Sequence, residues 1–161
     1  MSARRAAGQV RKTGRPRGVG QALVEFALVA PLFFVLLFAI IDFGRYVYYV
    51  QILNNAAREG ARYAIVHGSD SLAPTGPPSA DATGNAVKAV VRNYAIGVIA
   101  NTTALDVDVS WQDPVNPLAT PSNSRGNTVT VIATYQFNSL IPMVPIPALE
   151  IEGASTLVIN H

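Results

Sequence analysis

The sequence predicts an α+β protein in which a long N-terminal transmembrane helix continues into a small domain with a second helix and a three-stranded antiparallel sheet. Three observations predict this architecture. A basic, Gly- and Pro-containing start precedes a long apolar run, helical periodicity continues beyond that run, and the C-terminal third alternates apolar and polar residues as half-buried strands do. The 161 residues suffice for one ordinary domain.

Charge is distributed unevenly along the chain. The first twenty residues hold no acid and six basic side chains: Arg4, Arg5, Arg11, Lys12, Arg15 and Arg17. The other 6 basic and 10 acidic side chains give residues 21–161 a charge of about −4. A basic tail binds anionic lipid or nucleic acid. Lipid is the expected partner, because an apolar run follows at once, and no nucleic acid is expected, because the body lacks a basic patch interleaved with aromatic residues.

The apolar run from Gly18 to Ile41 has 24 residues, and Glu25 is its one charged side chain. About 20 residues cross a ~30 Å hydrocarbon core. We predict a basic leader at 1–20 that is cleaved, a transmembrane helix at 21–41, and an extracytoplasmic domain at 42–161. Pro31 removes one backbone hydrogen bond and predicts a kink or local unwinding.

The basic flank predicts a cytoplasmic N-terminus, and therefore a single-pass protein of the cytoplasmic membrane with its C-terminal domain in the periplasm or outside the cell. The alternative is a secretory signal that is removed whole. Such a signal has a short apolar region and a small-residue cleavage site. Here the run is long and ends in DFGRY without an A-x-A site.

From Asp42 to Val66 the pattern becomes amphipathic, so the first element of the domain, 42–66, should continue the helix until Gly68 caps it. Its outer half holds small residues that let another element approach closely. These helix-packing candidates are Ala57, Gly60, Ala61 and Ala64. Three tyrosines, Tyr46, Tyr48 and Tyr49, are expected in the outer interfacial belt, with a binding role as the alternative.

The rest of the chain predicts a loop at 68–81, a second helix over 82–96 capped by Asp81, and strands at 105–111, 128–138 and about 150–160. Asp106 and Asp108 share one strand face, which is either a cation site or simply solvated. The apolar segment 141–147 either caps the small core or forms an exposed docking patch.

The strongest local feature is Gly20, at the junction of the leader and the apolar run, with Glu25 five residues later. A charge within the bilayer costs ~2.5–3.5 kcal/mol on insertion scales and usually has a partner. The alternative is that Glu25 lies near the interface and reaches water. The chain has no cysteine and no nucleophile-elbow or P-loop motif, so we expect no enzyme activity, no catalytic residues, no cofactor and no metal site.

Gly20 and Glu25 match the spacing of type IV pilin-like proteins, whose basic leader is cut after a glycine and whose fifth mature residue is glutamate. Glu25 and Phe26 resemble the Glu-aromatic pair of the Flp/Tad branch. Within that branch, residues 24–68 resemble TadE-like pseudopilins closely, and residues 128–160 are similar to the tails of that family. Gln21 departs from type IV pilins, in which phenylalanine is usual at the first mature position.

The resemblance implies a minor pilin or pseudopilin-like assembly protein of a Tad (Flp) pilus and secretion system. A prepilin peptidase would cut it after Gly20, leaving Gln21 as the first residue. The implied partners are that peptidase, membrane lipid and other pilin-like subunits, with the carboxylate of Glu25 meeting the amine of an adjacent subunit. The rival hypothesis is an uncleaved, signal-anchored protein that carries an extracytoplasmic binding or hydrolase module.

Overall fold

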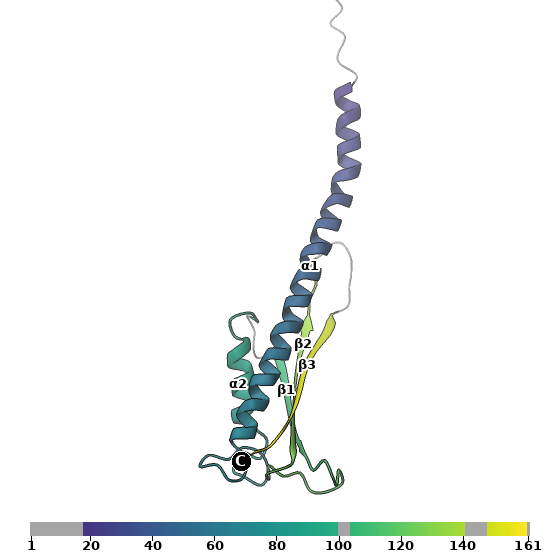
Figure 1. Ribbon diagram of the computed structural model, residues 1–161. Helices are drawn as coiled ribbons and strands as arrows, with labels where there is room; N and C mark the ends of the chain where they lie inside the picture. Colours follow the sequence, from purple (N-terminus) through teal and green to yellow (C-terminus); the bar gives the residue numbers. More distant parts are fainter. Residues whose placement is uncertain (1–17, 100–103, 141–147, 161) are drawn as a thin grey trace, which may run out of the picture. The chain divides into compact units, whose positions relative to one another are not determined.

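The computed structural model describes residues 18–99, 104–140 and 148–160, with side chains from Gly20 onward. The chain forms two compact units, Met1–Leu37 and Phe38–His161. Its elements are α1 (Gly18–Val66), α2 (Asn85–Ala95), β1 (Leu105–Gln112), β2 (Thr128–Phe137) and β3 (Leu149–Val158), as Figure 1 shows. The predicted α+β class is confirmed.

The first unit is described from residue 18 and is entirely helical. Its large apolar side chains are exposed on every side of α1, and they include Leu23, Phe26, Leu28, Leu32 and Leu36. A helix that is apolar all round belongs inside protein or lipid. Within the described residues, the stretch Gly20–Val66 is the one helix long and apolar enough to cross a membrane. The helix runs through Pro31 without a break, so the loss of one backbone bond does not unwind it.

The second unit combines the rest of α1 with α2 and an antiparallel sheet of order β1-β2-β3. Val109 of β1 lies opposite Val131 of β2, which lies opposite Ser155 of β3. This register places the odd-numbered residues of all three strands on one face, and that face is covered by the helices. The strand bounds differ by one or two residues from those that the alternation predicts.

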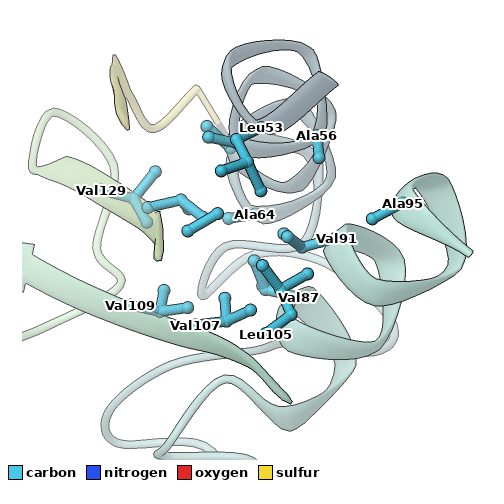
Figure 2. Close-up of a cluster of buried hydrophobic side chains, with 14 of the residues drawn as sticks. Leu53, Ala56, Ala64, Val87, Val91, Ala95, Leu105, Val107, Val109 and Val129 are labelled. Atoms are coloured by element: carbon cyan, nitrogen blue, oxygen red, sulfur yellow. The ribbon is translucent and has the colours of Figure 1, made fainter. Parts of the chain in front are cut away.

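The core lies between that sheet face and the two helices, as Figure 2 shows. Its side chains are mostly Val and Ala, with Leu53 contributed by α1 and Val87 and Val91 by α2. A Cβ at Gly60 would lie 2.5 Å from Cγ2 of Val91, and one at Gly153 would overlap the backbone of Leu53. Glycine is therefore what admits α2 and β3 to close contact with α1.

Helix α2 begins at Asn85, three residues later than the sequence predicts. Gly84 has φ of 67°, in the left-handed region, so the residues before Asn85 form a turn rather than helix. Asp81 still caps the helix, since its carboxylate accepts hydrogen bonds from the N–H groups of Asn85 (2.7 Å) and Ala86 (3.0 Å). The hydroxyl of Thr75 donates a third bond to the same carboxylate at 2.8 Å.

Candidate membrane-anchor and assembly site

The predicted processing and assembly residues all lie on the first unit of the chain. Gly20, Gln21, Glu25 and Phe26 are exposed on α1. Gln21 and Glu25 are four residues apart, so they lie on the same face of the helix, one turn from each other. Within the described part of the chain, Glu25 has no hydrogen-bond or ion-pair partner. The carboxylate is therefore available to a group supplied from outside the described residues.

The helix-packing candidates have a different location. Ala57, Gly60, Ala61 and Ala64 are all buried in the second unit. Gly60 approaches Val87 and Val91 of α2 and Val131 of β2. The small-residue face is thus covered by the same chain. The surface of α1 that remains for other subunits or for lipid includes the exposed apolar side chains from Leu23 to Phe43.

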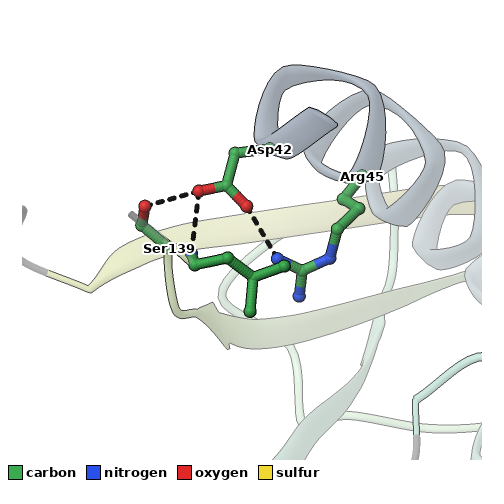
Figure 3. Close-up of polar contacts among 4 residues, drawn as sticks. Asp42, Arg45 and Ser139 are labelled. Carbon is green, nitrogen blue, oxygen red and sulfur yellow. Dashed lines mark hydrogen bonds and ion pairs between the residues drawn. The ribbon is translucent and has the colours of Figure 1, made fainter. Parts of the chain in front are cut away.

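Asp42, which is not among the site residues predicted from the sequence, holds α1 to the end of the sheet (Figure 3). Its side chain is buried and accepts three hydrogen bonds. The donors are the guanidinium of Arg45 at 2.7 Å, the hydroxyl of Ser139 at 2.5 Å and the backbone N–H of Leu140 at 2.8 Å. Ser139 is 97 residues from Asp42 in sequence. The local sequence does mark this position. Asp42 and Arg45 carry opposite charges three residues apart, and they directly follow the apolar run, whose one charged residue is Glu25.

Asp42 is ionised at neutral pH in this arrangement. Burial would raise the pKa of its carboxyl, but the hydrogen bonds from Ser139, Leu140 and Arg45 and the positive charge of Arg45 outweigh burial and lower the pKa. The guanidinium of Arg45 also lies over the ring of Phe137, 5.1 Å from its centroid. Charge and aromatic surface together fix the start of the β2–β3 connection to α1.

Two of the three tyrosines that we expected in the interfacial belt contact the sheet. Tyr46 meets Phe137 edge-on at 5.9 Å between ring centroids, and Tyr49 meets Tyr135 in the same way at 5.7 Å. Tyr48 is exposed. The spacing of the three residues turns two of them toward the domain, where aromatic packing is available.

The remaining candidates lie on the surface of the domain. Asp106 and Asp108 are exposed on the solvent face of β1, and within the described ranges no group of three or more His, Cys, Asp or Glu side chains could hold a metal ion. Elsewhere on the surface of α1, Arg62 and Glu59 are 3.9 Å apart and exposed, which makes them a weak surface pair. The segment 141–147 lies outside the described residues.

Most of the helix that carries these features matches a known family. Residues 20–62 match the model of the family described as TadE-like protein. No curated protein matches the chain, and no solved structure does. The match begins at the predicted processing glycine and includes Glu25, Asp42 and Arg45, and it ends before α2 and the sheet. Over residues 20–62, this chain is therefore similar to the TadE-like family.

Proposed function

We propose that the protein is a minor pilin-like, non-enzymatic assembly protein of a Tad (Flp) pilus and secretion system. The observation that carries the proposal is the coincidence of the TadE-like match with a helix that is exposed and apolar on all sides. The transfer of such a helix from water to lipid lowers its free energy, and close packing with similar helices lowers it further. The folded domain keeps its own core and needs no subunit contact to complete it.

The charge distribution supports an orientation with the N-terminus in the cytoplasm. Six basic residues precede the apolar run, and basic residues beside a span remain on the cytoplasmic side. The α+β domain then lies in the periplasm or outside the cell. The proposal includes removal of residues 1–20 by a prepilin peptidase, which leaves Gln21 as the first residue.

Cleavage gives Glu25 a chemical role. It creates an amine at Gln21, one helical turn from the carboxylate of Glu25. An unpaired carboxylate on a lipid-exposed helix is costly, and an amine from the next subunit recovers part of that cost. Because the amine is at a fixed place on each helix, the pair selects the register in which subunits assemble.

The test compares Glu25→Gln with Glu59→Gln, the same change on an exposed glutamate of α1 within the second unit. Crosslinking in membranes measures association, and N-terminal sequencing measures processing. We expect both variants to insert and to begin at Gln21, with crosslinks to other pilin-like subunits reduced for Glu25→Gln alone. Equal crosslinking of Glu25→Gln and wild type would show that Glu25 is only an interfacial residue.

Gly20→Arg tests the processing step separately. The variant should insert but keep its leader, because the peptidase requires the glycine that the resemblance implies. A wild-type protein that keeps its leader would support the rival, signal-anchored protein. A mature start beyond residue 45 would contradict the anchor itself, since the apolar run would then be gone.

A further inference from the structure

An open apolar groove of about 370 Å³ lies in the second unit, beside the first turns of its helix. Ala39, Phe43 and Tyr46 of α1 form one wall, and Phe137 and Leu149 from the facing ends of β2 and β3 form the other. Phe137 and Leu149 are opposite each other in the sheet register. The groove therefore lies at the end of the sheet remote from Trp111, which is opposite Val129.

The edge of the groove exposes large apolar side chains. Of the residues that line the groove, Phe43 is 69% exposed and Leu149 is also exposed. Leu140, which follows the lining residue Ser139 in sequence, is 55% exposed. From Asn138 to Leu149 the sequence has no charged residue. Large apolar side chains grouped at one end of a domain mark a surface that contacts a partner or a membrane.

Within the described residues, the groove presents no uncompensated charge that would attract a charged partner. Arg45 and Asp42 neutralise each other at 2.7 Å. Glu150 follows Leu149 but points to the opposite face of β3, where Gln136 donates a hydrogen bond to it at 3.2 Å. The partner must therefore be recognised by its apolar surface alone.

The position of the groove along the helix identifies that partner as lipid. Ala39 and Phe43 lie within one turn of Ile41, where the charge-poor run ends. Ile40, Ile41 and Phe43 are exposed in directions that together span about 160° around α1, so a single helix packed on one side would leave some of them in water. A layer of lipid at this level contacts all of them.

We propose that this groove takes phospholipid acyl chains, and that the domain is thereby seated on the outer surface of the bilayer. Asp42 determines the depth, because its hydrogen bonds hold Ser139 and Leu140 at the level of the helix where the apolar run ends. The inference rests on the membrane anchoring proposed above and not on assembly into a pilus.

The experiment uses the full chain in phosphatidylcholine vesicles and exploits the absence of cysteine. A nitroxide is attached to Leu149→Cys, to Leu140→Cys, or to the control Leu118→Cys, which is 97% exposed in the β1–β2 connection. Electron paramagnetic resonance then compares collisions with oxygen, which enters lipid, and with a polar nickel chelate, which does not. The single tryptophan, Trp111, is buried and reports by its fluorescence that each variant is folded.

We expect oxygen-to-nickel collision ratios on the order of tenfold higher at residues 140 and 149 than at residue 118, because polar solutes are excluded from hydrocarbon. Water-like ratios at both groove positions would overturn the inference. Shielding from both reagents would also overturn it, because a second copy or another protein would then cover the groove. If one groove variant fails to fold, the other decides the result.

A fourth label, at Leu28→Cys, separates failure of this inference from failure of the proposed anchoring. Leu28 is 74% exposed in the first unit and lies within the predicted span. A Leu28 label in lipid with a Leu149 label in water contradicts the seating alone. Both labels in water contradict the membrane anchor on which it rests.

Discussion

At the scale of single residues, Asp42 connects the helix to the sheet end. Asp42→Ala would leave the guanidinium of Arg45 and the N–H of Leu140 without their acceptor. We expect a loss of about 1–3 kcal/mol in the free energy of unfolding, because a buried donor without a partner costs that much. Denaturation of the full chain in detergent, followed by the fluorescence of Trp111, measures the loss.

The control for that change is Glu59→Ala, which removes an exposed carboxylate 3.9 Å from Arg62. Exposed pairs contribute about 0–1 kcal/mol, so this variant should remain close to wild type. If Asp42→Ala is as stable as the control, the three hydrogen bonds of Asp42 do not secure the β2–β3 connection.

Gly153 is a second residue where one atom decides the packing. A methyl group there would overlap the backbone of Leu53 in α1, and backbone cannot move aside as a flexible side chain can. We expect Gly153→Ala to lower the free energy of unfolding by about 1–3 kcal/mol or more. Gly97→Ala is the matched change, because a Cβ at Gly97 meets nothing within 4 Å. Equal thermal stability of the two variants would contradict the close approach of β3 to α1.

The sequence predicted some of these residues and not others, for a physical reason. Gly20 and Glu25 can be recognised from their neighbours in sequence. Gly20 lies at the junction of the basic leader and the apolar run, and Glu25 is the one charged residue in that run. The local sequence shows Asp42 beside Arg45 at the end of the apolar run, but it does not show that Asp42 accepts hydrogen bonds from residues 97 and 98 positions away. Gly153 stands in a strand without any sequence feature that reveals how close α1 comes.

At the scale of elements, the strands were predictable because their period is local. Alternation in β1 and β2 alone indicates which face is buried, and their observed burial follows it. The start of α2 was not predictable to the residue. It depends on the left-handed Gly84 and on a turn that Thr75 and Asp81 close, and Thr75 is itself held by contacts with other loops.

The capping residue of α2 predicts a dependence on pH. Burial would raise the pKa of Asp81, but hydrogen bonds from Ala86, Thr75 and Asn85 outweigh it and lower the pKa below its ordinary value. The folded protein therefore favours the ionised form. The ionised carboxylate of Asp81 stabilises the fold fully at pH values above the pKa of an unfolded Asp, about 3.9. This stabilisation is lost as the pH falls through the lower pKa that Asp81 has in the folded protein.

Asp81→Asn isolates this contribution. At pH 7 the variant should unfold more easily than wild type, and the difference should shrink as the pH is lowered below about 4, where Asp81 itself becomes protonated. Urea denaturation at both pH values measures the difference. A difference that does not change with pH would mean that the cap acts through its shape and not through its charge.

At the scale of the whole molecule, the apolar run, the continuing helix and the alternating strands were enough to predict an α+β chain with one anchor. The use of the small-residue face of α1 was not decided by the sequence. Ala57 and Ala61 could serve a neighbouring subunit or the same chain equally well by composition. The structure uses them inside the domain, because Val87, Val91 and Val131 fill the space beside Gly60.

That arrangement predicts that residues 42–161 fold without the apolar run. The buried hydrophobic residues of the described chain all lie between Leu53 and Ile159, so the fragment retains the whole core. Circular dichroism should show helix and strand together, with one cooperative thermal transition that coincides with the change in Trp111 fluorescence.

A fragment of residues 62–161 is the matched comparison, because it loses Leu53, Ala56, Ala57 and Ala61 from the centre of that core. It should remain largely unfolded, because it also loses Tyr46, Tyr49, Val50 and Ile52, which pack against the core. Each missing large side chain such as Leu53 removes about 2–5 kcal/mol, and a domain has only about 5–15 kcal/mol in total. Random-coil spectra from residues 42–161, or an equally cooperative transition from residues 62–161, would show that α1 is not the central element of the domain.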